Sequence, residues 1–173
     1  MNNFEIKIWD DEGKKCTFYT VQNEDDEYSE TDKFFIKFNA ISKYKSETEE
    51  LLVLIQEIIG DEYGAVDDFF NRYENEVQAL PFQGKVKLDE IQFQYQNFPL
   101  RLYALKITEE IVILFNGGIK DGKTNQESSL HLQWLEACNY AKKILEAIKQ
   151  GDILINTEDR KLTDINETDD LFL

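Results

Sequence analysis

The chain has 173 residues, of which 42% are hydrophobic and 13% aromatic, and its formal net charge is −16. A chain of this length and composition can form a hydrophobic core without disulfides or metals, and it lies outside the intrinsically disordered class. The charge excludes long-range attraction to nucleic acid or to an anionic membrane. Cys16 and Cys138 are the two cysteines, and we expect both to be free thiols in a reducing compartment.

The beginning of the chain resembles neither a signal peptide nor a membrane anchor. Residues 1–7 lack a basic region followed by an apolar run. The longest apolar stretches, residues 51–55 and 111–115, are too short to span a bilayer. We therefore expect a soluble, cytoplasmic protein with no membrane partner.

The first forty residues predict strands. Residues 4–8 alternate apolar and polar, and residues 17–21 are rich in strand-forming residue types after a turn at residues 10–13. These two segments predict a β-hairpin. Residues 23–33 are expected to form an acidic loop, and residues 34–38 a third strand.

Two helices are expected next. Residues 46–60 carry apolar residues at helical spacing, with Ser46 and Glu49 as a capping box and Gly60 as the stop signal. Residues 66–80 carry a second stripe of period 3.6, ended by Pro81.

The following segment predicts an antiparallel meander. Alternation at residues 86–88 and 91–95 changes parity at Asp89-Glu90, which indicates a bulge or a turn. Residues 100–107 and 111–115 follow, and the unbroken apolar run of the latter predicts a central strand buried on both faces.

Beyond that strand, Asn116-Gly117-Gly118 is expected to break the regular structure. A third helix is predicted from Ser128 or Ser129 to Gly151, with an edge strand at residues 153–155.

These elements cluster by type, so the predicted class is α+β, with helices packed on one face of an antiparallel sheet. We expect a single domain over residues 1–156, in which residues 1–33 form the hairpin and acidic loop. Residues 157–173 form an acidic tail whose apolar end, residues 171–173, either folds onto the sheet or hangs free.

The sequence gives no pattern for a metal or a cofactor. A single histidine, His131, and two distant cysteines do not provide zinc-ligand spacing. Residues 121–124 end in Gly-Lys-Thr but lack the upstream glycine of a phosphate-binding loop. We therefore expect no metal and no small-molecule cofactor.

Local charge singles out one segment. Residues 85–123 hold 6 Lys/Arg against 5 Asp/Glu, whereas both flanking regions are strongly acidic. This segment contains Pro99-Leu100-Arg101-Leu102-Tyr103-Ala104-Leu105-Lys106, a short turn, the apolar run, and a loop with Lys120, Lys123 and Thr124.

In this pattern the chain resembles the RelE/ParE toxin superfamily, in particular its HigB-like and phage-related branch, over residues 34–150. The resemblance implies a strand–helix–helix–meander core to which the N-terminal hairpin is added. It also implies a toxin of a toxin–antitoxin or phage-defence pair that cleaves mRNA on the ribosome without a metal. The partners it implies are RNA and an antitoxin with a helix-turn-helix domain.

Carried over to this chain, the resemblance implies a role for each of five residues. Arg101 would clamp the scissile phosphate, and Tyr103 would stack on a base or position the attacking hydroxyl. Lys120 and Lys123 would hold backbone phosphates, and His131 would act as acid or base.

Structural explanations remain open for the same residues. Arg101 suits a surface ion pair with Glu109 or Glu110, Tyr103 suits packing, and the two lysines suit a solvated loop. The alternative function is a non-catalytic protein-binding module of the same fold, either a ParE-like target inhibitor or a defence accessory protein, for which an acidic surface favours a basic protein partner.

Overall fold

The alternating residues at the start of the chain form the predicted hairpin, β1 (Phe4–Asp10) and β2 (Thr17–Asn23). The structure is a computed structural model, and it describes residues 3–120 and 130–173. β2 pairs in parallel with β7 (Ile111–Ile119), so that Thr17 lies opposite Ile111. This pairing joins the hairpin to strands that lie nearly a hundred residues further along the chain.

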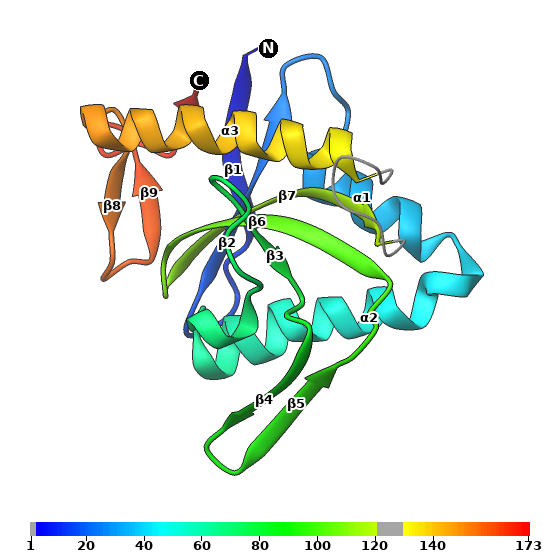
Figure 1. The fold of residues 1–173 in the computed structure, drawn as a ribbon. Helices are drawn as coiled ribbons and strands as arrows, with labels where there is room; N and C mark the ends of the chain where they lie inside the picture. Colours follow the sequence, from blue (N-terminus) through cyan, green and yellow to red (C-terminus); the bar gives the residue numbers. More distant parts are fainter. Residues whose placement is uncertain (1–2, 121–129) are drawn as a thin grey trace.

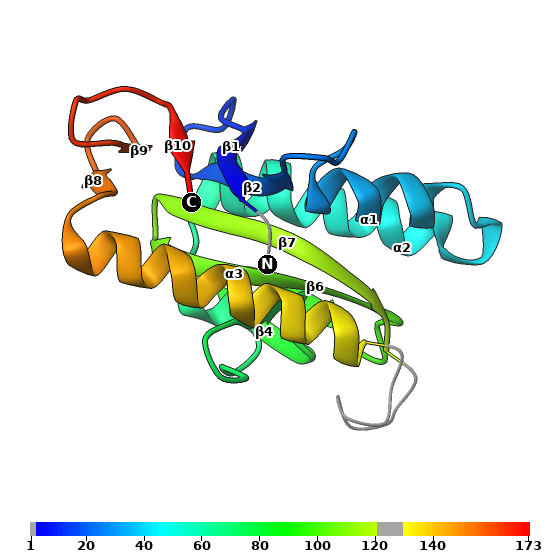
Figure 2. The ribbon, with the colours of Figure 1, turned by 90° about the horizontal axis from the view of Figure 1, so that it is seen from above.

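The central sheet has six strands in the order β10-β1-β2-β7-β6-β3 (Figures 1 and 2). All neighbours in this sheet are antiparallel except β2 and β7. The α+β class is therefore confirmed, with a mixed, mostly antiparallel sheet. The remaining strands of the described chain are β3 (Gln78–Leu80), β4 (Gly84–Leu88), β5 (Ile91–Tyr95), β6 (Leu100–Thr108), β8 (Leu154–Asn156), β9 (Lys161–Thr163) and β10 (Leu171–Phe172).

Helices cover both faces of the sheet, so the prediction of helices on one face is wrong. α1 (Glu30–Asn39) and α2 (Lys45–Val53) lie on one side, and α3 (His131–Gln150) crosses the other (Figure 2). The cause is visible in β7, whose residues alternate between two buried clusters: Val112 and Leu114 belong to the one under α1 and α2, while Ile113 and Phe115 belong to the one under α3. Two apolar faces each require a cover.

The predicted third strand at residues 34–38 is instead part of α1. Ser29 caps this helix, because its Oγ accepts a hydrogen bond from the backbone N–H of Asp32. Phe34 and Phe38 are one helical turn apart and both are buried, whereas Ile36 is 53% exposed. Phe34 and Phe38, two of the apolar residues that suggested a strand, are therefore on the buried face of a helix.

The predicted helix at residues 66–80 is also wrong. Residues 67–69 form a short 3₁₀ turn, Glu74 bridges to Val77, and the segment ends in β3, which pairs with β6. Phe69, Phe70, Val77 and Leu80 are buried, whereas Tyr73 is 58% exposed. The chain here is irregular and includes Asn75 in the left-handed region at φ 59°.

The predicted helix at residues 46–60 is present but has different ends. α2 begins at Lys45 without a side-chain cap, so the capping box at Ser46 is wrong. A π-helix, Leu54–Tyr63, continues α2 past Gly60 and ends at Gly64, whose φ is 81°. Gly60 serves a different purpose, because its carbonyl accepts hydrogen bonds from the N–H groups of Lys15 and Cys16.

β4 and β5 form a hairpin that projects from the body of the protein (Figure 1). The parity change at Asp89-Glu90 is the turn of this hairpin, with Asp89 at φ 54°. Phe93 fixes the hairpin to the core by edge-on contacts with Tyr63 and Phe69.

The C-terminal region begins with the predicted stop of α3, Gly151, in the left-handed conformation. β8 pairs with β9 in a separate two-stranded sheet, so the expected edge strand at residues 153–155 does not extend the main sheet. The apolar end of the tail folds onto β1, where Leu173 and Phe4 exchange backbone hydrogen bonds of 2.8 and 2.9 Å.

Both cysteines are free, and they lie in different buried clusters. Burial raises the pKa of the Cys16 thiol to about 12 and that of Cys138 to about 11. Among the helices of the described residues, none is both long and apolar enough to cross a membrane.

The pairing of β10 with β1 predicts unequal effects for two adjacent residues. Leu171 is 3% exposed and lies opposite Ile6, whereas Phe172 is 66% exposed. We expect Leu171→Ala to lower the free energy of unfolding by about 2 kcal/mol, because it leaves a cavity under α3. We expect Phe172→Ala to change it by less than about 0.5 kcal/mol. Urea denaturation measures both, and equal effects would contradict this pairing.

Candidate functional site

The residues proposed from the sequence come from three adjoining elements. Arg101 and Tyr103 lie on β6, Lys120 directly follows β7, and His131 is the first residue of α3. Lys123 lies outside the described residues. A fourth segment, the connection that carries Glu74, completes the site from the region wrongly predicted to be helical.

A β-bulge between β6 and β7 shapes the site. Asn116-Gly117-Gly118 was expected to end regular structure, but β7 continues through it to Ile119. Leu102 pairs with Gly117 and Ala104 with Leu114, so β7 carries one extra residue at this point. Glycine is required there, because a Cβ on Gly117 would lie 1.8 Å from the Arg101 carbonyl oxygen.

The bulge places the Arg101 and Lys120 side chains near one another. Arg101 pairs with Gly118, and Lys120 comes two residues later, where its backbone N–H donates to the Pro99 carbonyl over 2.7 Å. Residues two apart on a strand share a face, so Lys120 lies on the face that carries Arg101 and α3. Gly118 makes room on this face for the Leu130 side chain, which lies 3.0 Å from the position of a Cβ.

Arg101 forms an ion pair with Glu74. The distance from Arg101 Nη1 to Glu74 Oε1 is 3.0 Å, and the two side chains are 12% and 21% exposed. Arg101 Nε is buried and has no hydrogen-bond partner among the described residues. The sequence had suggested Glu109 or Glu110 as partner, and both suggestions are wrong, because Glu74 supplies the carboxylate.

Glu74 also contacts α3 through its backbone. Its carbonyl accepts hydrogen bonds from Trp134 Nε1 at 3.1 Å and from Cys138 Sγ at 3.8 Å. Glu74 therefore connects β6 to α3. Sequence reasoning missed Glu74, since this residue carries no local motif.

The pKa of Lys120 is lowered by its surroundings. Burial lowers the pKa of its ammonium group, the charge of Arg101 lowers it further, and Glu74 acts in the opposite direction. The two cations and the carboxylate therefore act on one another at short range.

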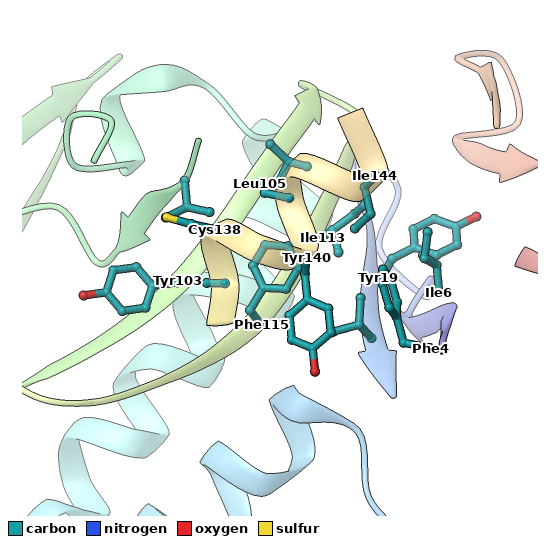
Figure 3. Close-up of a cluster of buried hydrophobic side chains, with 14 of the residues drawn as sticks. Phe4, Ile6, Tyr19, Tyr103, Leu105, Ile113, Phe115, Cys138, Tyr140 and Ile144 are labelled. Atoms are coloured by element: carbon teal, nitrogen blue, oxygen red, sulfur yellow. The ribbon is translucent and has the colours of Figure 1, made fainter. Parts of the chain in front are cut away.

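Tyr103 is fully buried, and its hydroxyl points away from the rings of Phe115 and Tyr140 (Figure 3). Burial raises the pKa of this phenol to about 12, opposed by the charge of Arg101 and by a hydrogen bond with it. A fully buried ring offers no face to a base, which argues against stacking, one of the two roles considered for Tyr103. The other role, positioning the attacking hydroxyl, would have to act through Arg101, with which the Tyr103 hydroxyl interacts.

His131 lies at the edge of this group. Its ring centroid is 5.7 Å from that of Trp134, and its Nδ1 is buried without a hydrogen-bond partner in the described part of the chain. Trp134 in turn bonds the Glu74 carbonyl, which connects His131 indirectly to Arg101. Among the described residues no hydrogen bond joins His131 directly to Arg101, Tyr103 or Lys120.

The arrangement can bind an anion. A guanidinium presents several N–H donors in one plane, which matches phosphate oxygens, and an adjacent ammonium adds charge. No three His, Cys, Asp or Glu residues within the described ranges lie close enough together to hold a metal ion.

Fold and site together define a mixed α+β protein with a cation pair at the bulged end of β6 and β7. Comparison of the chain with protein-family models, with curated proteins and with solved structures gives no match. The family resemblance of residues 34–150 consequently remains a hypothesis based on its motif.

The bulge predicts a contrast between two glycines. Gly117→Ala would place a methyl group inside the contact distance of the β6 backbone, so we expect it to lower the free energy of unfolding by about 3 kcal/mol. Gly118→Ala meets only the end of the Leu130 side chain, which can shift, so we expect a cost of about 1 kcal/mol. Chemical denaturation compares them, and an equal cost would mean that the bulge does not require Gly117.

The burial of Tyr103 predicts an alkaline loss of stability. Its folded-state pKa of about 12 exceeds the ordinary value of 10.0, so the unfolded chain loses the proton first as the pH rises. The protonated Tyr103 phenol makes its full contribution to the free energy of unfolding below pH 10, and this contribution is lost as the pH rises toward 12. We expect the free energy of unfolding of Tyr103→Phe to fall by about 1 kcal/mol less than that of the wild type between pH 9 and pH 11.

Tyr73→Phe is the matched control, because the Tyr73 ring is 58% exposed. Urea denaturation at each pH gives the slopes. Identical slopes for Tyr103→Phe and the wild type would contradict the raised pKa of Tyr103.

Proposed function

We propose that this protein is a toxin-like member of a toxin–antitoxin or phage-defence pair, acting as a metal-free endoribonuclease of the RelE/ParE type. The observation that carries the proposal is that two cations, Arg101 and Lys120, lie on one face of the sheet. Each makes the charged form of the other less favourable. Like charges held close together and partly out of water are costly, and a bound phosphate relieves that cost.

The order of elements also supports the proposal. From β2 onward the chain runs through α1 and α2, then strands that include β6 and β7, then α3. The resemblance implies a strand–helix–helix–meander core that begins at residue 34. Here residues 34–38 belong to α1, and the strand before the two helices is β2 of the N-terminal hairpin, so the order agrees only in part.

The chemistry is transfer of the phosphoryl group to the RNA's own 2′-oxygen. The 2′-hydroxyl loses its proton and attacks the neighbouring phosphorus, the bond to the 5′-oxygen breaks, and that oxygen gains a proton. Arg101 and Lys120 hold the phosphate oxygens as negative charge builds up on them. Tyr103 orients Arg101 through its hydroxyl. His131 is the candidate proton carrier, and Lys120, with its lowered pKa, gives up a proton more readily than an ordinary lysine, which suits protonation of the departing 5′-oxygen.

The test is controlled expression in bacteria together with RNA cleavage by the purified protein. We expect the wild type to arrest growth, and Arg101→Ala and Lys120→Ala to relieve the arrest and slow cleavage by about a hundredfold or more. Lys106→Ala is the matched control, because Lys106 lies on the same strand, is also 12% exposed and pairs instead with Asp67.

Arg101→Ala removes the ion pair between Arg101 and Glu74, so circular dichroism must first show that the variant is folded. Lys120→Ala provides a second variant that leaves this pair intact. Full growth arrest by both folded variants would contradict the assignment of catalysis to Arg101 and Lys120.

The second candidate is a non-catalytic protein-binding module of the same fold. A net charge of −16 favours it, because an acidic surface suits a basic protein partner better than RNA. Full burial of Tyr103 also removes one of the groups expected to contact RNA. Growth arrest by the wild type and by Arg101→Ala alike, with no RNA cleavage, supports this module. Its complex should weaken steeply with added salt, since electrostatic steering is screened.

A further inference from the structure

Glu74 occupies the place where a phosphate would contact Arg101. Its Oε1 lies 3.0 Å from Arg101 Nη1, and its charge also acts on Lys120. A phosphate held by the same two cations would make the same kind of contact. The carboxylate therefore imitates one anionic oxygen of a substrate.

A short turn presents this carboxylate. The Glu74 N–H donates to the Val77 carbonyl over 2.8 Å, and Asn75 between them adopts a left-handed conformation at φ 59°. At the other end, the N–H of Asn71 donates to the Ala79 carbonyl at 3.0 Å. The Glu74 carbonyl is fixed to Trp134 and Cys138 of α3, but its side chain is 21% exposed and extends from this fixed backbone.

The ion pair between Arg101 and Glu74 does not use all the N–H donors of Arg101. A guanidinium has five N–H donors, and Arg101 Nε is buried without a partner among the described residues. A single carboxylate oxygen in contact with Nη1 is therefore an incomplete match for Arg101. A tetrahedral phosphate offers more acceptors and more charge, so it can compete for the same position.

We propose that Glu74 is an internal competitor of the substrate: its carboxylate closes the Arg101–Lys120 site, and an RNA phosphate binds only by displacing it. This inference rests on the proposed function, whose site it regulates. Glu74 lowers the affinity for isolated phosphates and reserves the site for a ligand that brings further binding energy, such as an extended RNA strand.

The test uses inorganic phosphate as the probe and the full chain as the protein. Glu74→Gln keeps the size of the side chain and removes its charge. We expect phosphate to bind this variant about tenfold more tightly than the wild type, measured by isothermal titration calorimetry. We also expect phosphate to raise its melting temperature more than that of the wild type, because a ligand stabilises the folded state in proportion to its affinity.

Two controls isolate the site. Asp67→Asn breaks the ion pair of Lys106, which is on the same strand and 12% exposed like Arg101, so it should leave phosphate affinity unchanged. The double variant Glu74→Gln with Lys120→Ala should not show the gain in phosphate affinity expected for Glu74→Gln alone. If Glu74→Gln does not fold, Glu74→Asp withdraws the carboxylate by one methylene and should give a smaller gain in the same direction.

Equal phosphate affinity of the wild type and Glu74→Gln, or an equal gain with Asp67→Asn, would overturn the inference. The experiments distinguish a failure of this inference from a failure of the proposed function. Tighter phosphate binding that depends on Lys120, in a protein that neither arrests growth nor cleaves RNA, keeps the inference and rejects the nuclease. Arrest relieved by Arg101→Ala, with phosphate binding unchanged in Glu74→Gln, keeps the nuclease and rejects Glu74 as competitor.

Discussion

The structure depends on one strand that is apolar on both faces. β7 pairs with β6 on one side and in parallel with β2 on the other, and its alternate residues enter two separate cores. Burial of both faces requires helices above and below, which the chain supplies from regions about eighty residues apart. The segment between the π-helix and β3 passes from one face of the sheet to the other, because Phe69 is buried under α1 and α2 whereas Val77 is buried under α3. That connection carries Glu74 to the face on which Arg101 lies.

The candidate anion site lies at the end of β7, and its position follows from the burial of both faces of this strand. A strand buried on both faces cannot carry unpaired charges along its length, so Arg101 and Lys120 occur only where the sheet ends and α3 begins. The bulge at Gly117 turns the strand at this point, and Trp134 connects the first turn of α3 to the Glu74 carbonyl. The Arg101 side chain is therefore mostly buried but still reaches solvent. This degree of exposure suits a structural ion pair as well as an anion site.

Sequence reasoning predicted the parts of this fold in which local pattern and tertiary context agree. The hairpin of β1 and β2, the run of β7 and the stop of α3 at Gly151 are such parts. It failed at residues 34–38 and 66–80, because the apolar residues of a short segment can satisfy a strand or a helix period and only packing decides between them. In the site, Arg101 and Lys120 were found from a motif, whereas Glu74 was not, since its contact with Arg101 spans 27 positions of the chain.

The acidic charge of the protein and its cation pair act over different distances. At physiological ionic strength a charge is screened beyond about 8 Å, so a net charge of −16 governs the approach of a ligand more than its contact with Arg101 and Lys120. An RNA strand would thus meet repulsion first and attraction only at the site, which makes association slow unless a larger assembly holds the strand in place. The ribosome is such an assembly in the activity that the resemblance implies. The same reasoning applies to the proposed competition by Glu74, because a single carboxylate at contact distance outweighs many distant ones.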